Sequence, residues 1–224
     1  MASTLEKSLA KGGVILKAKL ERKMPEGLVL QPIEAEPALE IGGDFGIQVG
    51  KNGVALATFE TPKMRFDAFF KEGKSVQRIA WSGGGLPAPG EVALDLRQIL
   101  RWNLILKHSA KAREVRVLAD STIDGMACRG VSCELPVEIM NSTPAKQAEG
   151  IDESPGTIEV GAVKARIHFG KDDGLVKQLD IEVIRQFTGP GDPLEFVNHY
   201  TFTVQKYEPG LSIEIPADLR KLLE

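Results

Sequence analysis

The stretch Val163–Phe187 constrains the fold of this chain more than any other part of the sequence. Two arms flank a Gly-Lys-Asp-Asp-Gly turn, and in each arm apolar residues alternate with polar ones, which is the period of a β-strand. The apolar set is Val163, Ala165, Ile167, Phe169, Leu179, Ile181, Val183 and Phe187. Because the arms exceed the usual five or six residues, we predict a long β-hairpin within one large, curved antiparallel sheet that has one apolar and one wet face.

Further hairpins and strands are predicted on both sides of this hairpin. Residues 45–62 read as two strands around Gly-Lys-Asn-Gly, in which Asn-Gly supplies the positive φ angles of a tight turn. Residues 63–81 repeat this plan around Lys-Glu-Gly-Lys, and residues 113–139 repeat it around Ile-Asp-Gly. Single strands are expected at Val14–Arg22 and Glu195–Tyr207. Because strands recur at both ends without a linker-like shift in composition, we predict one domain over residues 1–224.

Helices are predicted at three places. The strongest is Glu91–Lys107, which has no proline, an acidic start, a basic end and a broad apolar face. A helix this hydrophobic must pack against something, so we expect it to cover the concave face of the sheet. A shorter helix is expected over Leu5–Lys11, capped by Ser3 or Thr4 and ended by two glycines. The chain closes on LSIEIPADLRKLLE, which predicts a short strand that runs through Pro216 into a terminal turn of helix.

Two stretches have the composition of loops. Ser82–Gly90 reads SGGGLPAPG, which fits neither a central strand nor a helix interior, and we predict a surface loop. It is interpreted either as a lid over a cavity mouth, with Leu86 and Trp81 as apolar contacts, or as a simple connector between sheet and helix. Asn141–Gly156 is polar and lacks periodicity, which predicts an exposed loop.

The charge and composition of the chain argue against several classes of partner and location. The 28 basic and 31 acidic residues are scattered over the chain and give a net charge of −3. No basic stripe is present, so a nucleic-acid partner is not predicted. No run approaches the roughly 20 apolar residues of a membrane helix. The first residues lack the apolar stretch of a secretory signal. Two alternatives remain, a cytoplasmic protein or an envelope protein whose signal has been removed.

Cys128 and Cys133 lie close together in ACRGVSC and allow two interpretations. A disulfide would indicate an oxidising compartment, but it requires the backbone to turn between the two residues. On a straight strand the two side chains would face opposite sides and would remain free thiols that behave as small hydrophobes.

The sequence contains no motif for catalysis, metal binding or a cofactor. The three histidines lie in different predicted elements and lack the spacing that brings metal ligands together. No Gly-x-Ser-x-Gly is present, and neither cysteine has an evident base. Acid–base chemistry would require carboxylates such as Asp120, Asp124 or Glu182 to pair in space.

Large apolar residues recur on one face of successive predicted strands and in the central helix, and they form our candidate site. The set is Phe45, Phe59, Phe66, Phe70, Trp81, Leu86, Trp102, Leu106, Phe169, Phe187, Phe196 and Phe202. One interpretation is an ordinary core packed by the helix. The other is that the helices cannot fill the concavity of so wide a sheet, which leaves an apolar pocket for a lipid-like guest.

The order of elements resembles that of the LolA-like superfamily, which includes periplasmic lipoprotein carriers and mycobacterial lipid-binding lipoproteins. The local resemblance runs from about Ala119 to the end, over IDGMACRGVSCEL, ARIHFGKDDGLVKQLDIEV, YTFTVQKY and IEIPADLRKLL. The first half matches in outline only. No lipobox cysteine lies near the start, and the buried arginine of the lipoprotein carriers cannot be assigned to a position here.

The resemblance implies a mainly β protein with some α structure, an unclosed β-barrel covered by one or more helices. It also implies a non-enzymatic protein of the periplasm or the secreted space. Its partner would be a lipid or another hydrophobic small molecule, and it would need no cofactor; another envelope protein is a further expected partner. Two rival hypotheses remain, an interaction domain whose concavity is filled by its own side chains and a hydrolase with spatially paired carboxylates.

Overall fold

The fold is a single antiparallel sheet of twelve strands. The computed structural model describes residues 2–23, 44–60, 64–72, 74–81, 88–90, 106, 109, 111–137, 157–188 and 194–222. The strands are β1 (Val14–Lys23), β2 (Asp44–Val49), β3 (Ala55–Glu60), β4 (Met64–Lys71), β5 (Lys74–Trp81), β6 (Ala88–Gly90), β7 (Arg113–Val117), β8 (Ser121–Ile123), β9 (Met126–Leu135), β10 (Thr157–Gly170), β11 (Val176–Thr188) and β12 (Leu194–Tyr207). Two helices are described, α1 (Ala2–Leu9) and α5 (Ala217–Arg220).

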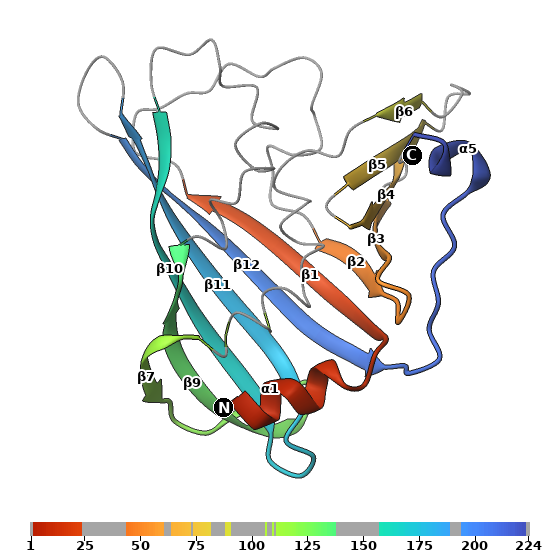
Figure 1. Cartoon of the computed structure of the whole chain (residues 1–224). Coiled ribbons are helices and arrows are strands. Elements are labelled where there is room, and N and C mark those ends of the chain that lie inside the picture. Colours follow the sequence, from red (N-terminus) through yellow and green to blue (C-terminus); the bar gives the residue numbers. More distant parts are fainter. Residues whose placement is uncertain are drawn as a thin grey trace.

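The strands are arranged in the order β6-β5-β4-β3-β2-β1-β12-β11-β10-β9-β7, and β8 pairs with β9. The sheet is curved, α1 lies at its end near the turn between β10 and β11, and the described end strands β6 and β7 do not pair with each other (Figure 1). The predicted large, curved and unclosed antiparallel sheet is therefore confirmed. Its helical cover is not, because the predicted helix Glu91–Lys107 lies outside the described residues apart from Leu106, whose backbone is helical.

The predicted hairpin around residues 170–175 is confirmed as β10 and β11. Lys164 pairs with Glu182 and Arg166 with Asp180, so polar residues face polar residues across the two strands. A register shift between Val160 and Ala162 marks a β-bulge. The predicted turn between β2 and β3 is confirmed in position, and Gly53 has a positive φ of 76°, but Asn52 does not share this conformation as the prediction required.

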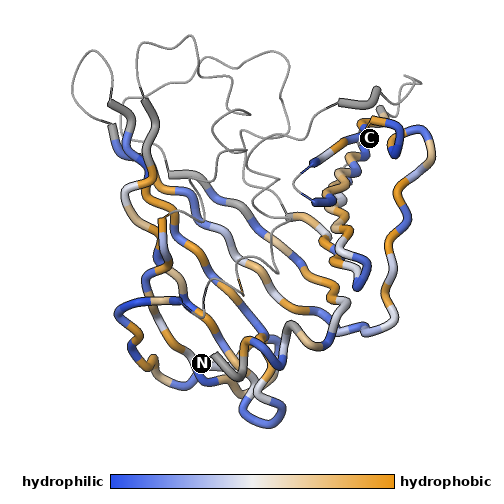
Figure 2. Tube along the Cα trace, in the orientation of Figure 1, coloured by the Kyte–Doolittle hydropathy of each residue, from blue (hydrophilic) through white to orange (hydrophobic). Residues whose placement is uncertain are grey.

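The two faces of the sheet differ in polarity, as Figure 2 shows by the alternation of hydropathy along the strands. On the concave face, one continuous core cluster extends from Phe66 on β4 to Leu135 on β9. Leu5 of α1 and Leu106 belong to this cluster. On the outer face, residues 211–219 cover β3 to β5 and form a second, smaller cluster around Phe69.

Three expectations about the elements need correction. The first helix begins at Ala2, so Ser3 and Thr4 lie inside it and do not cap it. The last three residues of the predicted loop Ser82–Gly90 form the edge strand β6, which a proline can join because an edge strand leaves one row of donors unpaired. The segment before Pro216 is extended but pairs with no strand, whereas the helical turn after it is confirmed as α5.

Candidate functional site

The predicted apolar lining lies on the concave face wherever the structure describes its side chains. Phe45, Phe66, Leu106 and Phe202 are buried in the core cluster. Phe59, Phe70 and Phe169 are half-buried and pack against it. Trp81, Phe187 and Phe196 lie in strands, but their side chains are not described, and Leu86 and Trp102 lie outside the described residues. The described members therefore share one surface.

An aromatic pair links two of these predicted residues across neighbouring strands. The rings of Phe45 on β2 and Phe59 on β3 lie 5.4 Å apart between centroids and are tilted by 38°. This is within the range in which aromatic pairs attract each other. Because Phe45 is buried and Phe59 is half-buried, the pair connects the core cluster to its margin.

A small polar cluster lies within the apolar concave face. Arg185 on β11 and Asn198 and Tyr200 on β12 are 5%, 0% and 2% exposed. The amide of Asn198 donates a hydrogen bond of 3.4 Å to the hydroxyl of Tyr200. Asn198 pairs with Val183 in the sheet, which places it diagonally next to Arg185 on the same face. We refer to these three residues as the inner polar cluster.

Sequence reasoning missed the inner polar cluster, although a signal was present. The apolar alternation of β11 runs through Ile181 and Val183 and then inverts, because the apolar Ile184 precedes the charged Arg185. A charged residue at a core position of a strand is an exception that calls for explanation. On β12 the corresponding exception is Asn198, two positions before Tyr200.

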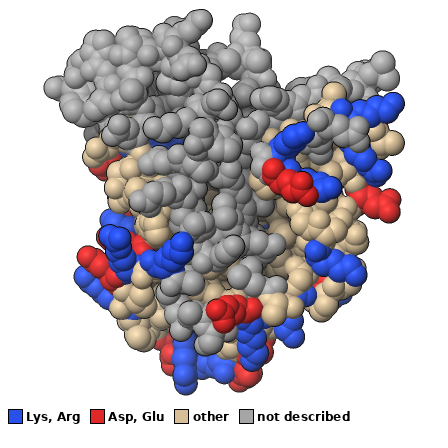
Figure 3. Space-filling view, in the orientation of Figure 1, with Lys and Arg blue, Asp and Glu red and all other residues tan. Residues whose placement is uncertain are grey.

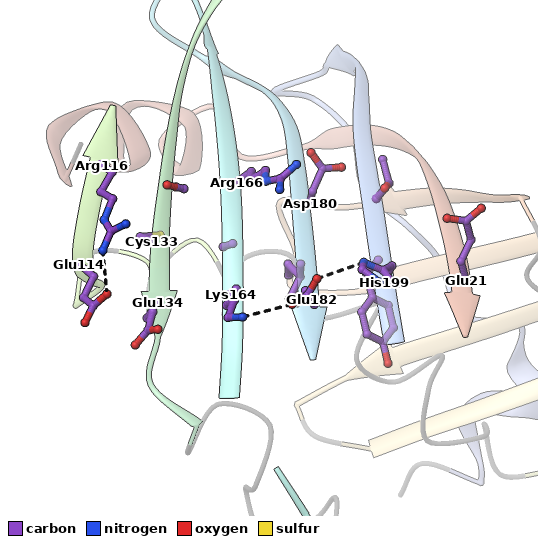
Figure 4. A pocket seen from close by; sticks show the side chains of 15 residues that line it. Glu21, Glu114, Arg116, Cys133, Glu134, Lys164, Arg166, Asp180, Glu182 and His199 are labelled. Atoms are coloured by element: carbon purple, nitrogen blue, oxygen red, sulfur yellow. Dashed lines mark ion pairs between the residues drawn. The ribbon is translucent and has the colours of Figure 1, made fainter. Parts of the chain in front are cut away.

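The outer face of the same strands carries a row of charged residues. Figure 4 shows this face, on which Glu134, Lys164, Glu182, His199 and Glu21 follow one another across β9, β10, β11, β12 and β1. Glu182 lies 3.6 Å from the Lys164 ammonium and 3.8 Å from Nδ1 of His199. These residues line an open groove of about 690 Å³ that ends at Glu114 and Arg116 of β7.

The outer groove has little chemical reactivity of its own. Its charges alternate in sign, so neighbouring side chains offset one another and form a solvated face. Figure 3 shows the same mixture of acidic and basic side chains on the described surface seen from the concave side. No group of three or more metal-ligating side chains occurs among the described residues. We therefore assign no ligand to this groove.

His168 brings a serine and an aspartate close together on the outer face, a contact that the sequence did not indicate. Its Nδ1 lies 3.1 Å from Oγ of Ser121, and its Nε2 lies 3.9 Å from Asp180. The second distance is too long for a hydrogen bond, and both oxygens of Asp180 instead accept from Gln178. Neither Ser121 nor His168 lines the groove. The residue types of acyl-transfer chemistry are present here without its geometry.

The carboxylates of the hydrolase hypothesis lie next to cations or in turns. Asp120 forms an ion pair with Lys171, and Glu182 lies next to Lys164 and His199. Asp124 is an exposed turn residue with a φ of 47°. Within the described residues, none of these three carboxylates pairs with a second carboxylate, as acid–base hydrolysis would require.

Both cysteines are free and buried. They lie five positions apart on the uninterrupted strand β9, which separates their backbones by about 16 Å. A disulfide needs Cα atoms within about 7 Å, so the free-thiol alternative describes this structure and the disulfide alternative does not. Burial raises the pKa of Cys133 to about 11. Burial also raises the pKa of Cys128, partly offset by a backbone hydrogen bond at Ile123 and by the positive charge of Lys177.

Sequence comparison identifies no relatives, because no protein-family model and no curated protein match the chain. None of the described helices is long and apolar enough to cross a membrane.

Structural comparison finds similar folds. LprF from Mycobacterium bovis has a TM-score of 0.50 at 11% identity, with 96% of this chain and 95% of that chain covered. The lipoprotein LppX of Mycobacterium tuberculosis has a TM-score of 0.49 at 10% identity, with 95% and 97% covered. A domain of Vibrio parahaemolyticus described as outer membrane lipoprotein-sorting has a TM-score of 0.30 at 8% identity, with 99% and 97% covered. The resemblance predicted from the sequence is confirmed as a likeness of fold to LprF over nearly the full length.

Proposed function

We propose that this protein is a non-enzymatic protein of the cell envelope that binds a lipid or another acyl-chain ligand on the concave face of its open sheet. The observation that carries the proposal is the continuous apolar face, which extends over eight strands of a sheet that does not close. An extracytoplasmic location agrees with the likeness of fold to LprF and with the resemblance of the sequence to lipid-binding lipoproteins.

The energetics of such a site are sufficient without polar contacts. Each buried methylene contributes about 0.8 kcal/mol, so ten methylenes give a gross gain of about 8 kcal/mol before the entropic cost of association is subtracted. The half-buried rings of Phe59, Phe70 and Phe169 offer apolar surface at the margin of the cluster. The central side chains are already shielded from solvent, as the 1% exposure of Phe202 shows. A ligand therefore reaches these central side chains only when the protein rearranges and exposes them.

Extraction of the purified protein with organic solvent, followed by mass spectrometry, tests this function, together with titration of a fluorescent fatty acid. We expect a copurified lipid or saturable uptake of the probe. Phe59→Ala should weaken probe binding several-fold, because it removes apolar surface at the margin. Thr203→Ala on the outer side of β12 is the matched control and should leave binding unchanged. Absence of both lipid and probe uptake would refute the proposal.

The near-complete burial of the concave face favours a second candidate function, an interaction domain with a self-filled core. Such a core leaves no space for a guest, so an excess of acyl probe would not change the free energy of unfolding. A ligand that binds the native state must raise this free energy by mass action. Urea denaturation with and without the probe therefore separates the two candidates.

A further inference from the structure

The turn between β2 and β3 contains a chemically labile pair, Asn52-Gly53. Of the four asparagines in the chain, only Asn52 precedes a glycine. An asparagine loses ammonia when the backbone nitrogen of the next residue attacks its side-chain carbonyl carbon. A glycine at the next position favours this attack, because it has no Cβ atom to obstruct it. The pair is therefore a candidate site of spontaneous chemical modification.

The structure leaves this pair accessible to water. Asn52 and Gly53 are both exposed, and a Cβ atom added to Gly53 would meet nothing within 4 Å. Asn52 also lines an open groove of about 580 Å³ that Ser212 and Ile213 border on the other side. The water that completes a deamidation can therefore reach the turn.

Hydrogen bonds hold both reacting groups in the native structure. Nδ2 of Asn52 donates to the Ile213 carbonyl at 2.8 Å, and Oδ1 accepts from the Ile213 N–H at 3.5 Å. The Gly53 N–H donates to the carbonyl of Gly50 at 3.1 Å. The side chain must leave Ile213, and the Gly53 nitrogen must leave Gly50, before the two groups can react. The C-terminal segment, residues 211–219, therefore restrains the reaction.

We propose that Asn52 is a site of spontaneous deamidation, that the C-terminal segment slows this reaction, and that the product releases the segment. The Gly53 nitrogen bonds to Cγ of Asn52, and the Cγ–Nδ2 bond breaks. The proton of the Gly53 nitrogen leaves with Nδ2 as ammonia. Water then opens the resulting succinimide ring and leaves aspartate or isoaspartate at this position. The reaction consumes only water, so no oxidant or reductant takes part.

The product lacks the donor that holds the segment. A carboxylate carries no N–H, so the Ile213 carbonyl loses its partner and faces a negatively charged acceptor. An isoaspartate also lengthens the main chain by one carbon within the turn. Ile213, Ile215 and Leu219, which are buried together with Phe69, then lose part of what fixes them to the outer face. Deamidation thus acts as an irreversible switch that exposes this second, smaller cluster.

Peptide mapping by mass spectrometry during incubation at pH 8 measures the deamidation rate of Asn52 in native buffer and in urea. We expect a native rate lower by a factor on the order of ten, because the hydrogen bonds of Asn52 and Gly53 must open first. Leu219→Ala loosens the segment without changing the turn and should raise the native rate several-fold. Ile215→Val is the milder substitute if this variant does not fold. Leu175→Ala changes a buried leucine beside β11 and is the matched control, with an unchanged rate.

The second half of the proposal is tested on the deamidated protein itself. Anion-exchange chromatography separates the deamidated fraction, which carries an additional negative charge, from the unmodified protein of the same preparation. Thermolysin should cleave residues 211–219 faster in the deamidated fraction. Equal deamidation rates in native buffer and urea, or in the wild type and both segment variants, would show that the segment does not restrain Asn52. Either of these results, equal cleavage of the two fractions, or no deamidation in urea overturns the proposal.

Discussion

The side chain of Asn52 holds the backbone of Ile213, which lies 161 positions later in the chain. Its Nδ2 donates a hydrogen bond of 2.8 Å to the carbonyl of Ile213, and its Oδ1 accepts one of 3.5 Å from the Ile213 N–H. Together with the backbone hydrogen bond of 2.9 Å from the Lys51 N–H to the Leu211 carbonyl, the amide takes the place of a neighbouring strand for this segment. It fixes the segment whose Ile213, Ile215 and Leu219 form the second cluster on the outer face.

We expect Asn52→Ala to lower the free energy of unfolding by about 1 kcal/mol, because the carbonyl of Ile213 loses its donor. The C-terminal segment should also become more sensitive to limited proteolysis. Asn52→Asp keeps the acceptor for the Ile213 N–H and lacks the donor, so it separates the two hydrogen bonds. Urea denaturation measures the first effect. Unchanged stability and proteolysis in Asn52→Ala would show that the apolar cluster alone holds the segment.

Gly13 lies where the start of β1 crosses the chain that follows β12. A Cβ atom at this position would lie 2.1 Å from the carbonyl oxygen of Glu208 and 2.6 Å from Cβ of Leu211. Gly13→Ala should therefore destabilise the protein by about 1–3 kcal/mol, the usual cost of overpacking. Gly210→Ala is the control in the same region, since a Cβ atom added to Gly210 would meet nothing within 4 Å. Thermal unfolding of both variants checks the difference; equal midpoints would contradict it.

The ionisation of Asp173 makes the stability of the turn between β10 and β11 depend on pH. Burial opposes its ionisation, but hydrogen bonds from Lys177 at 2.7 Å and from the Leu175 N–H at 2.9 Å outweigh this effect and lower the pKa of Asp173. Its folded-state pKa lies below the unfolded value of about 3.9, so its stabilising contribution is complete above that value and is lost as the pH falls through the lowered pKa.

Asp173→Asn should therefore be less stable than the wild type at pH 7, and the difference should shrink below about pH 4. The variant keeps an acceptor for the Leu175 N–H and loses the ion pair with Lys177. Asp172→Asn changes the adjacent exposed turn residue and is the matched control. Urea denaturation between pH 3 and pH 7 measures the effect. A difference that stays constant over this range would mean that the ionisation of Asp173 does not contribute.

The thiols of Cys128 and Cys133 should be unreactive in the native protein. Both are buried, and the raised pKa of Cys133, about 11, leaves almost no thiolate at pH 8. We expect a thiol reagent such as Ellman's reagent to modify neither residue in buffer and both in 6 M guanidinium chloride. Fewer than two thiols in the denatured, unreduced protein would indicate a disulfide and contradict the free cysteines of the structure.

The strands and hairpins could be predicted from the sequence because each depends on local information. The alternation of Val163–Phe187 determines which side chains of β10 and β11 face the core, since a shift by one residue would turn Ile167 and Ile181 to solvent. The turn formers at residues 50–53 indicated where β2 ends and β3 begins, because glycine favours the positive φ that Gly53 adopts. The apolar lining followed from these patterns at Phe45, Phe66 and Phe202.

The features that the sequence did not reveal all depend on contacts between distant segments. The inner polar cluster joins Arg185 to Asn198 through the pairing of β11 with β12, and the contact between Ser121 and His168 joins strands that are not neighbours in sequence. The position of Ile213 over the outer face is determined by Asn52 and Phe69 and not by any periodicity of the C-terminal segment. Local patterns indicate that a side chain is buried; they do not indicate what lies next to it.

The pairing of β1 with β12 has a consequence for how the protein folds. All other strand pairs join consecutive strands, apart from β7, which pairs with β9 across the short β8, so β1–β6 and β7–β12 can each assemble by local steps. Joining these two parts of the sheet brings Val14 to Tyr207 and Lys23 to Val197, which requires closure of a very long loop. Until that step, each part exposes an unpaired edge and half of the apolar face, the features that promote aggregation of folding intermediates. The time that the chain spends before β1 meets β12 is therefore the period in which it depends most on low concentration or on chaperones.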